Sequence, residues 1–342
     1  VVGLGRGVEG TAGEIFTICA TRDYLLVGRQ ARVDPVMDAT ALLAELESTV
    51  ERLLERHLAA SKEWFPHEHV PYGRGRDPIA GESWSEADAD LAGHTIDDAV
   101  RSSLLVNLLT EDNLPYYFRT VEGLFGTDGP WGTWVRRWTA EEGRHAMAIY
   151  GYLMATRAID PHHLERCRMA QVSRGETPNP ATLHHGFVYL ALQELATRIA
   201  HRSTGRMMGD PAGYDVMMRV AGDENLHQLF YRDLAAAAIE VDPDGMLIAM
   251  EEEVRTFAMP GTGIPGFVEH AKKIAAAGIY DLTVHHEQIL VPVVLRTWNI
   301  EAIEGLGQAG EEARERLMKR MAKSEKVAKR LAERREASLA TV

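Results

Sequence analysis

The chain has 342 residues, with 50 Asp and Glu against 37 Lys and Arg, a formal net charge of −13 at pH 7, and two cysteines. Apolar residues make up 45% and charged residues 25%, as in ordinary globular proteins, which excludes a disordered or fibrous chain. The negative charge argues against nucleic acid as the main ligand, because phosphate binding needs a basic surface.

Hydropathy and cysteine usage limit the possible class of protein further. The apolar stretch Ile289–Leu295 is only seven residues long and contains Pro292, so we expect no membrane-spanning helix. Cys19 and Cys167 lie far apart in the sequence and form no CxxC pair, which argues against a disulfide framework or a zinc ribbon. A reducing, cytoplasmic setting is therefore predicted.

The first 33 residues are rich in glycine, and Gly5–Gly10 fits the GxGxxG pattern of dinucleotide sites. That pattern requires a strand before it and a helix after it, within a unit of alternating strands and helices. Only four residues precede it here, and no such alternation follows. We therefore expect residues 1–33 to form a flexible extension rather than a nucleotide site.

From Pro35 onward, apolar residues recur at helical spacing and long alternating runs are absent, which predicts an all-α protein. We expect a main helical domain over residues 34–309 and a charged, basic C-terminal helix over residues 310–342. A loop rich in Pro and Gly is expected at 66–93, and Pro115 is expected to kink its helix. The expected helices are 35–62, 95–125, 131–159, 181–208, 213–240, 243–257, 266–277, 281–295 and 310–340.

Four of these helices carry an acid on the apolar stripe, where charged residues are rare unless they are paired or bind a metal. Two of the acids begin a Glu-x-x-His motif, whose members project from one face of a helix. The lone Glu and the motif Glu are 31 residues apart in the first pair of helices and 30 apart in the second. The residues are Glu111, Glu142 with His145, Glu194, and Glu224 with His227.

These six residues, carried by two similar pairs of helices, match the ligand set of ferritin-like di-iron and di-manganese carboxylate bundles. Four carboxylates balance two divalent cations, and two neutral imidazoles complete the shell, so the cluster can be buried. A single Glu-x-x-His motif is common by chance and usually marks a solvated helix face. Two such motifs, each preceded by a lone Glu about 30 residues earlier, favour a two-metal site in a ferritin-like four-helix bundle with additional flanking helices.

Around these ligands the sequence resembles the soluble acyl-[acyl carrier protein] desaturases, over roughly residues 35–330. Gly143, Thr120 and Gly123 depart from the family pattern and leave the chain length and double-bond position open. The matching segments are Thr110–Pro115, Trp138–His145, Gly186 with Phe187, Gln193 with Glu194, Asp223–His227, Asp242–Gly245, and Met259 with Pro260.

The resemblance implies that the six ligands hold two irons, with Glu142 and Glu224 bridging. It implies a catalytic role for Thr197 beside the oxygen-binding side of the cluster. Leu124, Gly186 and Phe187 would line the acyl tunnel, and Trp64 and Asp223 would carry electrons to His145. The alternative interpretation is a core position for Trp64, Leu124 and Phe187, and for Thr197 a hydrogen bond to the carbonyl one turn back.

The family activity is the introduction of a cis double bond into a saturated acyl chain, using O₂ and two electrons from ferredoxin. The partners implied are an acyl carrier protein, ferredoxin and a second copy of the chain in a homodimer. The alternatives are another di-iron oxygenase or hydroxylase on the same fold, a ferritin-like iron-binding protein, and a purely structural bundle.

Two further expectations concern charge and histidine. Since acyl carrier protein is acidic, we expect a local basic patch near the tunnel mouth, with Arg255, Lys272 or Lys273 as candidates. The pairs His162-His163, His184-His185 and His285-His286 lack the HxxHH pattern of integral membrane desaturases. We interpret them as surface or packing residues.

Overall fold

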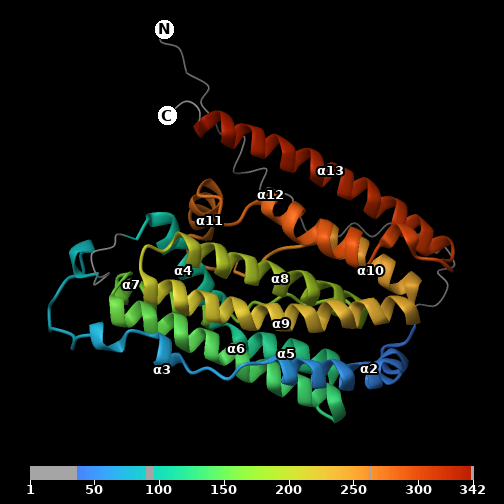
Figure 1. The fold of residues 1–342 in the computed structure, drawn as a ribbon, viewed down its shortest axis with the longest axis horizontal. Coiled ribbons are helices and arrows are strands. Elements are labelled where there is room, and N and C mark those ends of the chain that lie inside the picture. The colour runs from blue at the N-terminus through green and yellow to red at the C-terminus, as the bar shows by residue number, and fades with distance from the viewer. Residues whose placement is uncertain (1–36, 90–95, 262, 340–342) are drawn as a thin grey trace, which may run out of the picture.

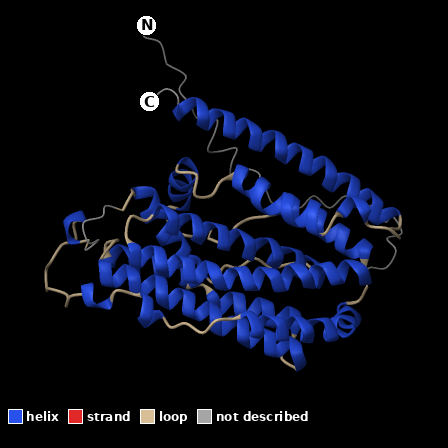
Figure 2. Cartoon of the chain, in the orientation of Figure 1, coloured by secondary structure: helices blue, strands red, loops and turns tan. Residues whose placement is uncertain are grey.

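The computed structural model describes residues 37–89, 96–261 and 263–339, and every regular element in these ranges is a helix (Figures 1 and 2). The all-α prediction is therefore confirmed for the described part of the chain. The predicted extension over residues 1–33, with its GxGxxG pattern, lies outside the described residues.

Four long helices form the centre of the molecule, and a fifth packs on them. α8 (Leu183–Met207) and α9 (Pro211–Val241) make the most extensive contact, and α4 (Asp98–Glu111) and α6 (Gly129–Thr156) lie beside them. α2 (Ala39–Ala60), within the helix expected over residues 35–62, packs against α9 and α6 and buries Leu42, Leu46 and Val50. These helices bury their apolar stripes against one another, which places the charged stripe positions in the interior.

The remaining elements surround this bundle. Short helical turns occupy the described part of the loop predicted over residues 66–93. The helix over Pro161–Arg174 was not expected, because most of its residues are polar. The elements are α3 (Pro66–His69), α5 (Leu114–Phe125), α7 (Pro161–Arg174), α10 (Pro243–Thr256), α11 (Phe267–Ala276), α12 (Leu282–His285), a π-helix (His286–Thr297), α13 (Gln308–Leu339), and 3₁₀ turns at Tyr72–Arg74, Glu86–Asp88 and Ile300–Ala302.

The helix predicted over residues 95–125 is in fact two helices, so the prediction of one kinked helix was wrong. α4 begins after Asp97, whose carboxylate accepts a hydrogen bond from the Ala99 amide at 2.7 Å, and ends at Glu111. A short turn leads into α5, where Pro115 occupies the first turn. Proline is tolerated there because an N–H in the first turn has no partner within the helix.

The segment predicted as a helix over residues 281–295 begins as α12 and continues as a π-helix to Thr297. Its wider hydrogen-bonding pattern is visible at its end, where the Trp298 amide donates to the Val293 carbonyl five residues back. Pro292 lies inside this segment and has no N–H, so a regular α-helical ladder would be broken there.

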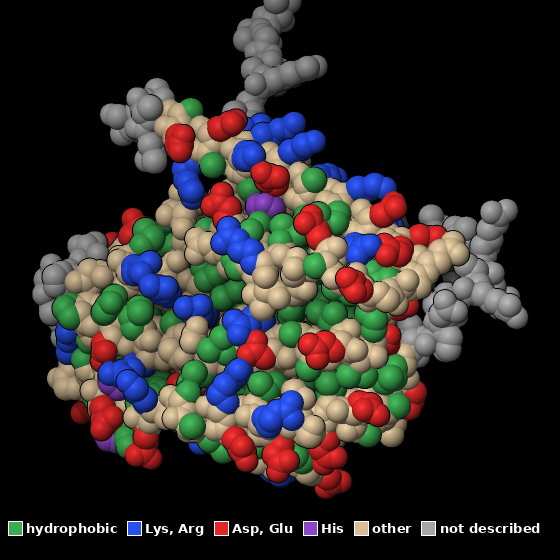
Figure 3. Space-filling view, turned by 45° about the vertical axis from the view of Figure 1, so that its right-hand side comes forward, with side chains coloured by type: hydrophobic (Ala, Val, Ile, Leu, Met, Phe, Trp, Pro, Cys, Tyr) green, Lys and Arg blue, Asp and Glu red, His purple; other side chains and the backbone are tan. Residues whose placement is uncertain are grey.

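The C-terminal helix α13 lies across α10 and α12, at the top of the molecule in Figure 1. Leu317 and Met321 are buried in the same apolar core as residues of α8 and α9, so the helix forms part of the packed structure. Basic side chains outnumber acidic ones along it, and Figure 3 shows them on the ridge where α13 lies. Among the described residues, no helix is both long and apolar enough to cross a bilayer.

Candidate metal centre

The six predicted metal-binding residues come together in the centre of the bundle. Glu111 is the last residue of α4, Glu142 and His145 lie on α6, Glu194 lies on α8, and Glu224 and His227 lie on α9. All six side chains are buried, with less than a tenth of each residue exposed.

Their ligand atoms fall into two overlapping groups of four. One group contains Glu111, Glu142, His145 and Glu224, and the other contains Glu142, Glu194, Glu224 and His227; within each group the ligand atoms lie within 4.8 Å of one another. Glu142 and Glu224 belong to both groups. The arrangement therefore offers two adjacent cation positions that share two carboxylates.

Four inward-facing atoms test whether metal ions fit this space. Glu142 Oε1, His145 Nδ1, Glu194 Oε2 and His227 Nδ1 are buried and make no hydrogen bond within the described residues. Each histidine presents its Nδ1 to carboxylates, since His145 Nδ1 lies 3.3 Å from Glu224 and His227 Nδ1 lies 2.9 Å from Glu142. Buried polar atoms without partners are costly, and two divalent cations would satisfy them. The donor set therefore fits a two-metal site.

The electrostatics of this site reflect the crowding of acids. Burial and the charge of Glu224 hold the pKa of Glu194 well above its usual range. Burial alone would lower the pKa values of His145 and His227, but the surrounding carboxylates outweigh it and raise both. Burial alone would raise the pKa of Glu111, but the neighbouring His145 and His201 outweigh it, so its net shift is downward.

The second ring nitrogen of His145, Nε2, is held by an acid on α9, the helix that carries Glu224 and His227. His145 Nε2 lies 3.3 Å from Asp223 Oδ2, and Trp64 Nε1 donates to the same oxygen at 2.9 Å. Arg144 donates to this oxygen as well and lies over the Trp64 ring. The structure therefore brings the predicted Trp64, Asp223 and His145 into one hydrogen-bonded chain.

His227 has a corresponding arrangement that the sequence analysis missed. His227 Nε2 lies 3.0 Å from Glu141 Oε2, and His57 Nε2 lies 2.9 Å from the same oxygen. Asp223 and Glu141 each directly precede a shared carboxylate, Glu224 or Glu142. An acid pair at the start of each Glu-x-x-His motif was therefore the available signal, whereas nothing in the sequence points to His57.

Thr197 lies against the shared carboxylate Glu224. Its hydroxyl is 2.7 Å from Glu224 Oε2, and it also lies within hydrogen-bonding distance of the Glu194 and Gln193 carbonyls one turn back. His201, one turn further along α8, lies 2.8 Å from Glu111 Oε1 through its Nε2. Both side chains are buried and face the cavity described next.

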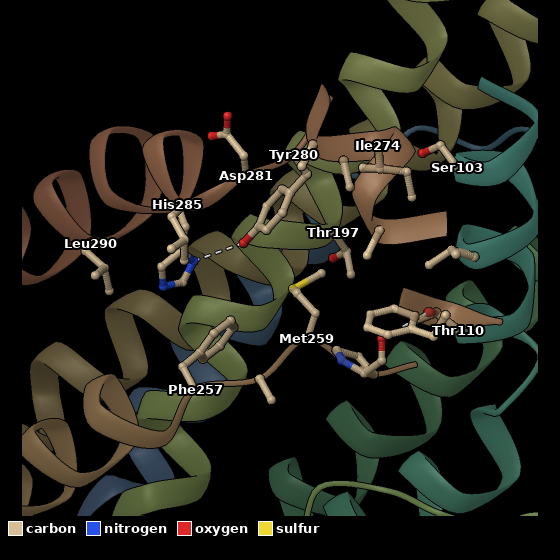
Figure 4. Close-up of a pocket in the computed structure, with 18 of the residues that line it drawn as sticks. Ser103, Thr110, Thr197, Phe257, Met259, Ile274, Tyr280, Asp281, His285 and Leu290 are labelled. Carbon is tan, nitrogen blue, oxygen red and sulfur yellow. Dashed lines mark hydrogen bonds between the residues drawn. The ribbon is translucent and has the colours of Figure 1, made fainter. Parts of the chain in front are cut away.

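Two cavities reach the metal centre from different sides. The outer cavity, of about 250 Å³, reaches Glu111, Thr197 and His201 and is lined by residues of α4, α8, α11 and α13. Figure 4 shows Thr110, Thr197, Ile274 and Tyr280 among its lining residues. The inner cavity, of about 40 Å³, reaches Glu111, Glu142, Glu194 and Glu224. Thr110, Glu111 and Pro260 line both cavities, which therefore meet beside the carboxylates.

The three predicted tunnel residues take different positions. Leu124 lines the inner cavity, and Gly186 lies directly behind it, since a Cβ atom on Gly186 would lie 2.7 Å from Leu124 Cδ1. Phe187 is fully buried and packs against the rings of Phe125 and Trp131 instead of lining either cavity.

The predicted basic patch is only partly where it was expected. Arg255 lines the outer cavity, whereas Lys272 pairs with Glu269 at 2.8 Å and Lys273 pairs with Asp98 at 2.7 Å. Arg320 and Lys323 of α13 line the cavity in their place.

Taken together, the helical bundle and its two overlapping carboxylate–histidine groups define a ferritin-like carboxylate protein with room for two cations. A family model described as "Fatty acid desaturase" matches residues 38–341. The chain therefore belongs to the fatty acid desaturase family.

Similar proteins agree with this assignment. The chain is 39% identical over 286 residues to "Putative acyl-[acyl-carrier-protein] desaturase DesA1" of Mycobacterium tuberculosis H37Rv, covering 81% of this chain and 83% of that protein. It is 33% identical over 312 residues to acyl-[acyl-carrier-protein] desaturase 4, chloroplastic, of Oryza sativa subsp. japonica, covering 84% and 73%. The X-ray structure of DesA2 from M. tuberculosis H37Rv matches with a TM-score of 0.63 at 24% identity, covering 80% of this chain and 99% of that one. This match confirms the predicted ferritin-like fold.

Proposed function

We propose that the protein is an oxidoreductase that desaturates an acyl chain attached to acyl carrier protein. The observation that carries the proposal is the pair of overlapping ligand groups, sharing Glu142 and Glu224, beside a cavity lined mostly by apolar side chains. The relatives named as acyl-[acyl-carrier-protein] desaturases support the same substrate class.

In this proposal two irons occupy the centre. Glu111 and His145 would bind one, Glu194 and His227 the other, and Glu142 and Glu224 would bridge them. When bound, the irons would supply the oxidising power, taken from O₂, that removal of hydrogen from an unactivated methylene requires. The protein side of the chemistry is to hold the acyl chain beside Glu111 and Thr197 and to exclude water.

Thr197 is proposed as a catalytic residue that holds a proton beside the shared carboxylate. Its hydroxyl lies against Glu224 Oε2 and also faces the outer cavity, so it is placed between the metal centre and the substrate. The hydrogen bond to Glu224 distinguishes this role from simple capping of the preceding turn.

Electrons are proposed to enter through Trp64, Asp223 and His145. The three groups form a continuous hydrogen-bonded chain, and Trp64 precedes Phe65, whose side chain is exposed at the surface. Ferredoxin is the proposed electron donor.

The cytoplasmic location and the homodimer expected from the sequence also remain predictions.

The carrier protein is proposed to dock at the mouth of the outer cavity. Three basic side chains, Arg255, Arg320 and Lys323, line this cavity against one acid away from the metal centre, Asp281, in a protein whose formal net charge is −13. Such a local patch attracts an acidic partner at low ionic strength. Affinity for the carrier should therefore fall as salt is added, and affinity indifferent to salt would contradict this docking site.

The decisive experiment supplies ferrous-loaded protein with O₂, reduced ferredoxin and acyl carrier proteins bearing saturated chains of several lengths. Mass spectrometry should show the loss of two hydrogens from one of them. A gain of one oxygen instead would identify a hydroxylase on the same fold, and no change on any chain would overturn the desaturase proposal. Iron uptake without turnover would favour a ferritin-like iron-binding protein.

A further inference from the structure

One polar pair lies in the outer cavity away from the carboxylates. The Tyr280 hydroxyl and His285 Nδ1 lie 2.9 Å apart, and both residues line the cavity. Figure 4 shows this pair on the opposite side of Met259 from Thr110. His285 was expected to be a surface or packing residue, and the structure adds that it lines the proposed substrate space.

The His285 ring is fixed and neutral. It stacks on Phe257, with ring centroids 4.8 Å apart and the planes inclined by 27°. Burial, with a smaller effect from His286, lowers the pKa of His285 to about 4. A neutral imidazole carries one proton, so when Tyr280 donates to Nδ1 the proton lies on Nε2. Figure 4 shows this second nitrogen on the side of the ring away from Tyr280.

Building on the proposed acyl-carrier substrate, we propose that His285 Nε2–H donates a hydrogen bond to the carbonyl oxygen of the acyl thioester, and that Tyr280 positions the ring. The thioester carbonyl is the polar group that separates the apolar chain from the carrier's prosthetic arm. A carbonyl entering an apolar cavity needs a hydrogen-bond partner, and His285 offers one on the cavity wall.

This contact would make His285 a positioning residue for the reaction. A carbonyl held at one point of the wall fixes how far the chain extends toward Glu111 and Thr197. The methylenes that reach the metal centre are then determined by counting from the carbonyl. Loss of the contact would let the chain slide and would spread the double bond over neighbouring positions.

The test compares ligands with and without the carbonyl. Binding of palmitoyl and stearoyl carrier proteins is measured against carrier proteins bearing hexadecyl and octadecyl thioethers. The wild type should prefer the thioester about fivefold, the effect of one hydrogen bond. His285→Phe should lose this preference, and His285→Gln, which keeps an N–H, should retain part of it. His286→Gln is the matched control, since His286 contacts Ser324 of α13 and does not line the cavity.

The second readout is the position of the double bond. His285→Phe should give a mixture of positions where the wild type gives one. An unchanged thioester preference and a single, unchanged position in His285→Phe would overturn the inference and leave the proposed function intact. Failure of the wild type to bind or desaturate any acyl carrier protein would instead overturn both. If His285→Phe does not fold, Tyr280→Phe provides the same comparison, because it removes the hydroxyl that orients the imidazole.

Discussion

Histidines in two regions of this molecule have opposite electrostatic surroundings. At the metal centre, carboxylates raise the pKa values of His145 and His227 against the effect of burial. In the outer cavity, where the neighbours of His285 are Tyr280, Phe257 and His286, burial lowers its pKa to about 4. The same side chain is thus prepared for a cation site in one region and for an uncharged ligand in the other.

The difference shows that neighbouring charge, rather than burial, separates the two roles. Each metal-centre histidine faces carboxylates at Nδ1 and is held by a further acid at Nε2. His285 is held instead by a neutral hydroxyl and an aromatic ring. Changes at the metal centre should therefore remove metal, whereas changes at His285 should alter substrate placement and leave the metal in place.

The largest expected effect is at the predicted metal ligands. Glu142→Ala removes a carboxylate from both cation positions, and His227→Ala leaves three acids without a nitrogen ligand. Each variant should lose bound iron, measured by metal analysis of purified protein with circular dichroism to confirm folding. The control is Glu51→Ala, at an exposed position of α2. A full di-iron complement in either variant would show that the ligand assignment is wrong.

The outer acids should give the next largest effect. Asp223→Asn and Glu141→Gln keep the shape of the side chain but remove the charge that orients His145 or His227. Loss of such a partner typically weakens metal binding by roughly 10- to 100-fold. Competition with a chelator measures this affinity. If one variant weakens metal binding and the other does not, the outer acids do not support His145 and His227 equally, and the description of the two as equivalent ligands would be wrong.

Trp64 tests whether the chain beside His145 has a role that the chain beside His227 lacks. Trp64→Phe keeps an aromatic side chain, although a smaller one, and removes the indole N–H that donates to Asp223. Reduction of the iron centre by ferredoxin should slow by about tenfold, which corresponds to about 1.4 kcal/mol in the barrier and is of the size of one lost hydrogen bond. Stopped-flow spectroscopy follows it, and reduction by dithionite should be unchanged. Trp84→Phe, which alters a tryptophan bonded to the Arg157 carbonyl, is the control. Equal slowing with both reductants would indicate a damaged centre rather than a lost electron path.

Much of the metal centre was predictable because its information is local. The spacing of Glu142 and His145, and of Glu224 and His227, follows from one helical turn. The repeat of about 30 residues then identified the lone partners Glu111 and Glu194. No such pattern marks His57, which lies near the end of α2 and contacts Glu141, a residue 84 positions further along the chain.

The fold class was predictable for the same reason, and its interruptions were not. Apolar stripes predicted the long helices, but the polar sequence of α7 buries only Leu164, Cys167 and Gln171 and carries little periodic signal. The position of His285 on the cavity wall was not predictable, because it depends on tertiary contacts with Phe257 and Tyr280. The π-helix that follows it also lies outside what a period of 3.6 residues can predict.

The smallest expected effect is on the pH dependence of stability, and it tests the neutral state of His285. An unfolded histidine has a pKa of about 6.5, whereas the folded value for His285 is about 4. Between these values the unfolded chain binds more protons than the folded one, so the free energy of unfolding falls as the pH drops from 6.5 toward 4. His285→Gln has no such proton to gain. From pH 7 to pH 5 it should lose about 2 kcal/mol less stability than the wild type, as judged by urea midpoints. His67→Gln, at an exposed position, is the control and should follow the wild type. If His285→Gln also followed the wild type, His285 would be able to take up a proton in the folded protein, and the contrast with the metal-centre histidines would not hold.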